Sequence, residues 1–391
     1  MALQFSDQPK HQRPLEGLVV VDLTRVLAGP FATMILAQLG AKVIKVETPH
    51  GGDDSRKFPP FVQGQSLYYN SLNYDKWSIA LDLKQDADRA LFDRLLSRAD
   101  FLVENYRPGT MEKLSYSWES LHEKHPQLIY GSVSGFGQTG PMSKYPAYDM
   151  VVQALGGVMS LTGYEGQPPV RVGVSIGDMA AGLYLVVALE GALIRRLQGL
   201  GGSRVDIAML DCQVALLEGA LANYLTTGTV TRALGSRHYA ITPFQSYRTK
   251  DSHLILAGGN DRIYALACET IGRPELAHDP RFLSNTDRCQ NADAMEVELE
   301  KTLQEKTTKE WAELLRSKGV PCAPIQNVAE VANDPQVRAR HMIMSMDHPT
   351  MGKFQTAGTP VKMTGMPEEL EHHPPPELDS DRQAILAWLQ G

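Results

Sequence analysis

The stretch LVVVDLTRVLAGPFATMILAQLGAKVIKVE, residues 18–47, decides the fold class. Residues 18–23 form a continuous apolar, β-branched run, which is typical of a strand buried on both faces. A loop at 24–30 leads into a helix pattern over residues 31–39 that ends at Gly40, and the run KVIKVE at 42–47 is a second strand. This βαβ unit predicts parallel strands joined by a right-handed crossover.

The same alternation continues through the first half of the chain. Further strands are expected at 79–83, 101–104, 128–134 and 204–209, with helices at 87–98 and from Asp178 to about Leu197. A second group has a strand at 253–257 and helices near 262–271, 292–304 and 308–318. The fold class is therefore α/β: a large doubly wound, Rossmann-like domain, whose ligands bind at the carboxyl ends of the strands, plus a smaller α/β domain. We expect a large domain at 1–205, a linker at 206–235, a small domain at 236–325, and a connection back to the large domain with a tail at 326–391.

Composition excludes several classes of function. The formal charge is −7 and no run of Lys and Arg reaches five residues, which argues against nucleic-acid or anionic-membrane partners. The four cysteines are far apart, so neither disulfides nor a zinc site is expected. Residues 1–14 lack an apolar signal region, and the apolar stretch 179–194 is shorter than the ~20 residues that span a bilayer. We expect a soluble cytoplasmic protein without a metal.

The segment GFGQTG at 135–140 matches the dinucleotide-binding pattern GxGxxG. Pro141 and polar residues follow it where that pattern requires a helix, so nicotinamide binding is not favoured. The glycines instead predict a loop that approaches a ligand closely. The chain has no GxSxG, HExxH or Walker pattern, so hydrolase, metalloprotease and P-loop chemistry have no support.

The segment VRVGVSIGDMAAGLYLVVALEGALIRR, residues 170–196, places Asp178 directly before a long apolar helix. One interpretation makes Asp178 the N-cap of that helix, a position where Asp is common. The other makes it a reactive carboxylate, because the helix N-terminus favours its ionised form and Gly177 leaves room for a bulky partner. The local pattern leaves both interpretations open.

Five segments in one order resemble the class III CoA-transferase family, of the formyl-CoA transferase and carnitine-CoA-transferase type. They are residues 15–47, GGDDSR at 51–56, ENYRPGTMEKL at 104–114, PAYDMVVQALGG at 146–157, and the Asp178 segment. The resemblance runs from about Leu15 to Met363. It implies that Asp178 is the nucleophile, that coenzyme A is a co-substrate, and that no tightly bound cofactor is needed. The intermediates it implies are an aspartyl anhydride and an aspartyl-CoA thioester.

The resemblance also implies site residues, position by position. Leu27 and Ala28 are expected to line the coenzyme channel, and Tyr148 lies beside the nucleophile together with Asp149, which is expected to bind substrate. The segment that meets the coenzyme supplies the other expected contacts, which are Asn105, Tyr106, Arg107 and Lys113. Arg107 and Lys113 are cations suited to its phosphates, although surface charges at the start of a helix would look the same.

Departures from the family pattern concern the substrates. Formyl-CoA:oxalate enzymes carry Gln where Leu27 stands, Arg where Thr48 stands, and a tetraglycine loop where this chain reads GSRHYAITPF at 235–244. The pattern is closer to the acetyl-CoA:oxalate and succinyl-CoA:dicarboxylate branches. Arg237 and His238 therefore become candidates for holding the distal carboxylate of a dicarboxylic acid.

Two other functions compete with transfer. An α-methylacyl-CoA racemase shares the fold but needs a His base, and this chain has Tyr148 at that position, whose phenol is a poor base at neutral pH. A non-catalytic CoA-binding protein would have no need for an intact Asp178. The resemblance further implies ring-shaped monomers that interlock as a homodimer.

Overall fold

The computed structural model describes residues 13–367 and 371–391. The chain forms two compact units, and each is described by itself. The first unit contains the described residues before 160, then 171–229 and those from 335 on; the second contains 160–170 and 230–334. The expected linker at 206–235 differs from this division. Helix α9 (Met209–Ala215) packs against α6 (Asp149–Leu155) and α8 (Ile176–Arg195), so most of that segment belongs to the first unit.

A six-stranded parallel sheet with the order β5-β2-β1-β6-β7-β8 organises the first unit, as the sequence predicts. Its strands in this order are Lys76–Ala80, Lys42–Glu47, Val19–Asp22, Phe101–Glu104, Ile129–Ser134 and Arg204–Ala208. Successive side chains enter opposite faces: Val20 joins one core cluster, and Val19 and Val21 join another. Both faces are buried, which explains the continuous apolar runs.

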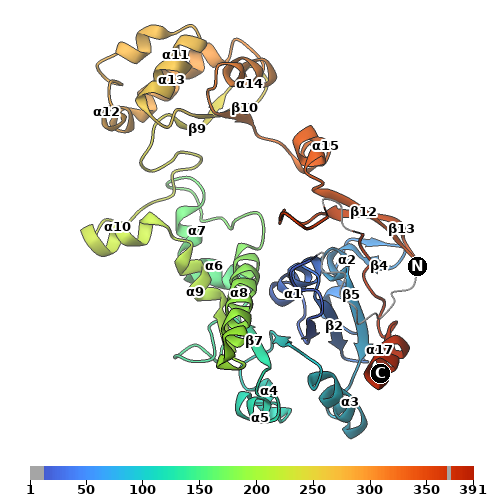
Figure 1. Ribbon diagram of the computed structural model, residues 1–391. Helices are drawn as coiled ribbons and strands as arrows, with labels where there is room; N and C mark the ends of the chain where they lie inside the picture. Colours follow the sequence, from blue (N-terminus) through green and yellow to red (C-terminus); the bar gives the residue numbers. More distant parts are fainter. Residues whose placement is uncertain (1–12, 368–370) are drawn as a thin grey trace. The chain divides into compact units, whose positions relative to one another are not determined.

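Helices cover the two faces of this sheet. Helices α1 (Ala28–Gln38) and α8 pack against each other on one face (Figure 1). Helices α3 (Asp86–Leu96), α5 (Trp118–Lys124) and α17 (Arg382–Gln390) supply the core of the other. The remaining elements of the first unit are η1 (Asp54–Lys57), β3 (Phe61–Val62), β4 (Gln65–Ser66), α2 (Leu67–Asn73), α4 (Thr110–Lys113), α7 (Val158–Leu161), η2 (Arg196–Leu200), α10 (Gly219–Thr227), α16 (Pro335–Ala339), β12 (Ile343–His348) and β13 (Gly352–Ala357).

The second unit has its own core around an antiparallel sheet, β11-β10-β9. The three strands are Cys322–Pro324, His253–Ala257 and Phe244–Arg248. Helices α11 (Asp261–Thr270), α13 (Ala292–Leu303) and α14 (Thr308–Ser317) cover it with apolar faces that include Tyr264, Leu299 and Trp311. The other elements are η3 (Pro274–His278), α12 (Asn285–Gln290) and α15 (Val328–Asn333). The expected strand at 253–257 is present, and helices lie close to the expected positions near 262–271, 292–304 and 308–318.

Some expected boundaries are wrong. Strand β5 begins three residues before the expected 79–83 segment, and α1 begins at Ala28 rather than Phe31. Pro30 sits in the first turn of α1, where its missing N–H costs nothing. Helix α8 begins at Ile176 with Ser175 at its N-cap position. Asp178 is therefore the third helical residue, and the N-cap interpretation is wrong.

Helix α8 and the turn after it, Ile176–Leu200, are apolar and long enough to cross a membrane by composition alone. In the structure α8 buries one face in the core of the first unit through Ala181, Leu185 and Leu189. Leu183, Val187 and Ile194 are exposed on other positions of the helix. The expectation of a buried helix therefore holds for one face only.

Candidate functional site

Parallel strands bring the loops that follow them to one edge of the sheet. The loop after β1 carries Leu27, the loop after β6 carries Asn105, and the loop after β7 ends at Tyr148. These loops contact one another directly. Asn105 Oδ1 accepts from the backbone nitrogen of Arg25 at 2.9 Å, and Asn105 Nδ2 donates to the carbonyl of Arg25 at 2.8 Å. The structure thus joins two of the predicted coenzyme-binding segments at the carboxyl edge.

The segment after β6 presents two cations to solvent. Arg107 and Lys113 are exposed, and neither side chain has an ion-pair partner in the described part of the chain. Tyr106 is partly buried on the core cluster below, and the Arg25 guanidinium lies 5.7 Å from the centre of its ring. Unpaired cations at a ligand-binding edge are available to an anionic group such as a phosphate.

Asp178 lies in the first turn of α8, half-buried. Its carboxylate accepts no hydrogen bond and forms no ion pair with any residue the structure describes. The first turn of a helix normally offers unpaired amides to such a group. Here the amide of the preceding residue has another acceptor, because the backbone nitrogen of Gly177 donates to Asp149 Oδ1 at 2.8 Å.

Asp149 is the first residue of α6 and only 7% exposed. Its second oxygen, Oδ2, accepts from Gln153 Nε2 at 2.7 Å, and Gln153 Oε1 accepts from the backbone nitrogen of Val172 at 3.0 Å. Asp149 and Gln153 therefore hold both ends of the segment that precedes Asp178. Since the Asp149 carboxylate is buried and already paired, we revise its expected role from substrate binding to positioning.

The electrostatic state of Asp178 differs from the expected one. Burial raises the pKa of its carboxyl, and the nearby Asp149 charge raises it further, to about 7. The expectation that the surroundings of Asp178 favour its ionised form is therefore wrong: burial and a like charge both favour the neutral carboxyl. A carboxylate poised near neutral pH and without hydrogen-bond partners is more basic than an exposed one, which suits a nucleophile.

Asp178 and the coenzyme loop are linked through helix packing. A Cβ on Gly182 would lie 2.8 Å from the carbonyl oxygen of Ala28, so α8 touches the start of α1 at this glycine. Gly182 is one helical turn after Asp178, on the same face. Ala28 therefore meets the face of α8 that carries the carboxylate, and Leu27 is the residue directly before it. Tyr148, at the N-cap position of α6, is 77% exposed and adjoins Asp149.

Tyr68, a residue of α2, belongs to this site and was not among the expected residues. Burial raises the pKa of its phenol, and the charges of Asp178, Asp53 and Asp149 raise it further, to about 12. The phenol is therefore a neutral group near three carboxylates. No sequence motif identifies Tyr68, because neither α2 nor the short hairpin before it has a recognisable pattern.

The glycine segment at 135–140 is a loop, as expected, since the next helix, α6, begins only at Asp149. A Cβ on Gly135 would lie 2.2 Å from Cβ of Ala147, so this glycine lets the two ends of the loop meet just before α6. A small cleft beside it is lined by residues that include Gly137, Thr139 and Asp211. The described residues contain no cluster of His, Cys, Asp and Glu suited to a metal ion.

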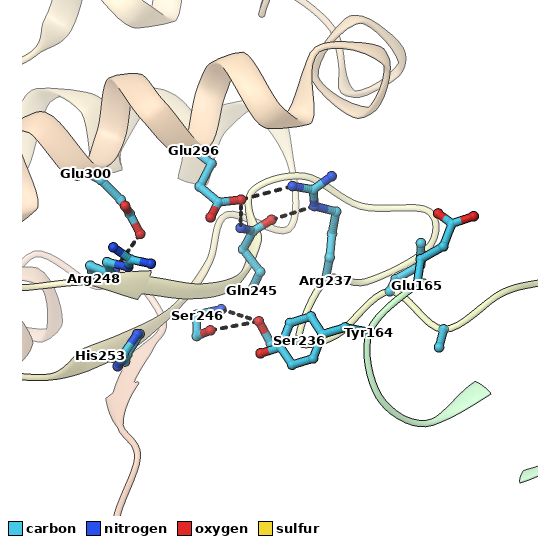
Figure 2. Close-up of a pocket in the computed structure, with 12 residues that line it drawn as sticks. Tyr164, Glu165, Ser236, Arg237, Gln245, Ser246, Arg248, His253, Glu296 and Glu300 are labelled. Carbon is cyan, nitrogen blue, oxygen red and sulfur yellow. Dashed lines mark hydrogen bonds and ion pairs between the residues drawn. The ribbon is translucent and has the colours of Figure 1, made fainter. Parts of the chain in front are cut away.

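Arg237 and His238 lie in the second unit, where Arg237 lines a cleft of about 430 Å³ and His238 is not among the lining residues. Figure 2 shows Arg237 directed toward Glu296 and Gln245. The Arg237 Nη2 atom lies 2.8 Å from Asp293 Oδ1 and 2.9 Å from Glu296 Oε2. Two acidic partners thus already engage the guanidinium, which leaves Nη1 for a further acceptor. His238 stacks between Tyr239 and Phe244, and its Nδ1 accepts from the backbone nitrogen of Ala240.

The chain is similar to a set of known proteins over nearly its whole length. Residues 15–382 match the model described as CoA-transferase family III. Acetyl-CoA:oxalate CoA-transferase of Acetobacter aceti is 42% identical over 96% of each chain. Succinyl-CoA:glutarate CoA-transferase of Homo sapiens is 40% identical over 96% of this chain and 85% of that protein. A solved CAIB/BAIF family protein from Brucella suis has a TM-score of 0.85 and 37% identity, covering 98% of this chain and all of its own.

Proposed function

Because the chain belongs to CoA-transferase family III, we propose that it moves coenzyme A from an acyl-CoA donor to a small carboxylic acid, with Asp178 as the covalent carrier. The single observation that carries this assignment is the Asp178 carboxyl itself. It is half-buried in the first turn of α8, lacks a partner in the described residues, and has a pKa near neutrality. An ordinary helix-capping aspartate would accept a backbone hydrogen bond instead.

The chemistry proceeds in two halves. One oxygen of Asp178 attacks the thioester carbon of the donor, the C–S bond breaks, and the coenzyme A thiolate leaves, which gives an aspartyl anhydride. The thiolate then attacks the aspartyl carbonyl carbon and expels the donor acid as a carboxylate, which gives an aspartyl-CoA thioester. The acceptor carboxylate repeats these steps in reverse and restores the Asp178 carboxylate. No proton is gained or lost overall, so no general acid is required.

Residues of the first unit would hold the coenzyme. Ala28 meets the face of α8 that carries Asp178, which supports a role for Ala28 and the preceding Leu27 in lining the coenzyme channel. Arg107 and Lys113 are exposed cations suited to the coenzyme phosphates. Asn105, Tyr106 and Tyr148 are the other proposed contacts from the same edge of the sheet.

The substrates are proposed from the relatives. Names among them specify acetyl-CoA, succinyl-CoA and formyl-CoA as donors, with oxalate, glutarate and mesaconate as acceptors. We therefore propose acetyl-, succinyl- or formyl-CoA as donor, and a dicarboxylate such as oxalate as acceptor. Arg237 would hold the distal carboxylate through Nη1, beside His238. An Arg237→Ala variant is expected to weaken acceptor binding about tenfold or more, and an unchanged acceptor KM would contradict this role.

A racemase-like proton transfer is the alternative. It requires bases on both faces of the substrate α-carbon. The position expected for one base is Tyr148, whose phenol is a poor base at neutral pH. Incubating a 2-methylacyl-CoA in deuterated water without an acceptor separates the two activities. A racemase exchanges the α-proton for deuterium, whereas CoA transfer breaks no C–H bond and leaves that proton in place.

We also propose that two copies of the chain form a homodimer of interlocked, ring-shaped monomers that works in the cytoplasm. Exposed apolar side chains support a partner: Val187 in the middle of α8 and Leu197 just beyond its end are 66% and 76% exposed, and α10 contains no buried residue. Apolar faces of this kind are costly in water. Light scattering on dilution is expected to show the mass of two chains throughout the active range, and an active monomer would contradict the dimer.

A panel assay tests the function. Each donor is incubated with each acceptor, and the new acyl-CoA is separated by chromatography and identified by mass spectrometry. Transfer to at least one dicarboxylate is expected in the native protein and is expected to be lost in Asp178→Asn, which keeps the size of the side chain. Transfer by Asp178→Asn at the native rate would overturn the proposed mechanism.

A further inference from the structure

Side chains, rather than backbone partners, hold the loop between β1 and α1. The backbone nitrogen of Thr24 donates to Asp22 Oδ1 at 2.8 Å, and the carbonyl of Thr24 accepts from Lys45 Nζ at 2.7 Å. Both backbone groups of Arg25 bond to the side-chain amide of Asn105, as described above. The backbone nitrogen of Val26 donates to Asp53 Oδ1 at 3.0 Å. All but one of the backbone polar groups of residues 24–26 thus have a side-chain partner from another segment or from Asp22.

Two of these side chains form a buried ion pair. Lys45 Nζ lies 3.0 Å from Asp53 Oδ2, and the two side chains are 0% and 1% exposed. Burial disfavours the charged form of Asp53, but Lys45 and the hydrogen bonds from Ser55 and Val26 outweigh it and lower its pKa to about 2. A buried pair of this kind usually gains little stability over apolar residues of the same size. Its presence therefore calls for a reason other than stability.

The loop contains a strained residue. Val26 has a φ of 67°, in the left-handed region that β-branched residues rarely adopt. Such a conformation persists only when the surroundings impose it, and it gathers at functional sites. In this conformation the backbone nitrogen of Val26 donates to Asp53. The next two residues are Leu27 and Ala28, and Ala28 meets the α8 face that carries Asp178.

The turn GGDDSR at 51–56 in turn fixes Asp53. The backbone nitrogen of Asp53 donates to Glu47 Oε2 at 2.9 Å, and Arg56 binds the same carboxylate through Nε and Nη2 at 2.8 and 2.7 Å. Gly52 has a φ of 68°, and a Cβ there would lie 2.7 Å from Glu47 Oε2. The turn is therefore built around the Glu47 carboxylate. In this arrangement the Asp53 carboxylate accepts the hydrogen bond from the backbone nitrogen of Val26.

We propose that the turn at 51–56 and Lys45 form a positioning device for coenzyme A, which holds the strained loop 24–26 so that Leu27 and Ala28 meet the coenzyme preorganised. This inference rests on the proposed function, since it takes Leu27 and Ala28 as coenzyme contacts. A loop already held in its bound conformation loses less entropy when the ligand binds. Asp53 is on this account a positioning residue that never touches the substrate.

Val26→Gly tests the device without disturbing the buried charges, because glycine adopts positive φ freely. Calorimetric titration with coenzyme A is expected to show affinity reduced about tenfold, with no loss of melting temperature, and hydrogen exchange is expected to be faster at residues 24–28. The matched control is Gln63→Gly, which relaxes another residue at positive φ (50°) in an exposed turn. The control is expected to bind coenzyme A as the native protein does.

Asp53→Asn tests the clamp directly. It is expected to weaken coenzyme A binding at least as much as Val26→Gly, with a lower melting temperature, whereas Asp86→Asn removes an exposed charge at the start of α3, outside the turn and the loop, and is expected to change neither. Coenzyme A affinity unchanged in Val26→Gly, with faster exchange in the loop, would overturn the inference while leaving the proposed function intact. Failure of the native protein to bind coenzyme A at all would instead defeat the proposed function.

Discussion

Asp149 Oδ1 accepts the hydrogen bond of the Gly177 backbone nitrogen at 2.8 Å, so Asp149 binds the amide directly before Asp178 in the first turn of α8. Two acidic side chains lie near the same helix N-terminus, and the buried one is paired. The result is an unpaired Asp178 with a pKa raised to about 7 by burial and by the Asp149 charge. Burial is the larger cause of the raised pKa of Asp178, and the charge of its neighbour Asp149 adds to it.

Replacing Asp149 by Asn removes this neighbouring charge and keeps an oxygen for Gly177. The pKa of Asp178 is expected to fall, because only the burial effect remains. Since the nucleophile acts in its ionised form, kcat/KM rises with pH through about 7 in the native protein, and in Asp149→Asn this rise is expected at lower pH. Asp86→Asn, an exposed acid at the same position of α3, is the control and should leave the profile in place. A profile for Asp149→Asn that coincides with the native one would refute the coupling.

Gly177 has to be a glycine for this contact to form. A Cβ there would lie 2.7 Å from Val152 Cγ2 and 3.0 Å from Asp149 Oδ1. Gly177→Ala is therefore expected to push the start of α8 away and lower kcat about tenfold or more, with coenzyme A affinity nearly retained. Adding Val152→Ala removes the closer contact and is expected to restore part of kcat. Steady-state kinetics of the two variants decide this, and a double variant no better than the single one would contradict it.

Two buried glutamines provide a matched pair. Gln153 bonds to Asp149 and to Val172, whereas both polar atoms of the Gln213 side chain are buried without a partner in the described residues. Gln153→Leu removes the hydrogen bond to the Val172 nitrogen and leaves Asp149 Oδ2 with Arg171 Nη1 at 3.9 Å alone, and it is expected to cost about 1–3 kcal/mol of unfolding free energy and to lower kcat. The same change at Gln213 is expected to be neutral or stabilising. Denaturant unfolding compares them, and equal losses at both positions would count against the clamp.

The raised pKa of Asp178 also predicts that its ionised carboxylate lowers the stability of the folded protein at and above neutral pH. A carboxyl whose pKa is higher in the folded state than in the unfolded chain stabilises the fold at low pH, and that contribution is lost as pH rises through the folded value, about 7. The neutral variant Asp178→Asn is therefore expected to match the native protein near pH 4 and to be more stable above pH 7, by roughly 4 kcal/mol at most. Thermal melts across this range measure the difference, and a variant less stable than the native protein at pH 8 would exclude the raised pKa.

Local patterns were sufficient for the sheet and for the edge at which the site lies. The apolar run before Asp22 and the run KVIKVE each predict a buried strand, and parallel strands place the loops of Leu27, Arg107 and Tyr148 at one edge. The proposed nucleophile was not identifiable from local chemistry, because an aspartate at the start of a helix is usually a cap. The ordered set of family motifs singled it out.

Contacts between distant segments account for what the sequence did not reveal. The bond from Gly177 to Asp149 joins residues 28 apart, and nothing in either segment announces it. In the sequence, Lys45 and Asp53 are ordinary charged residues of a strand and a turn. In the structure both side chains are buried and form an ion pair with each other. The pKa of Asp178 likewise depends on burial and on Asp149, neither of which a helix pattern reveals. The predicted starts of two helices were wrong. Helix α1 includes Pro30 in its first turn, and α8 begins after Ser175 rather than at Asp178.

Trapping the acyl-enzyme tests the central claim most directly. The protein is incubated with each acyl-CoA donor and hydroxylamine, and the modified peptide is located by mass spectrometry. The account predicts a hydroxamate on Asp178 that appears only with a productive donor and is absent from Asp178→Asn. A hydroxamate on any other residue, or transferase activity retained in Asp178→Ala, would contradict it.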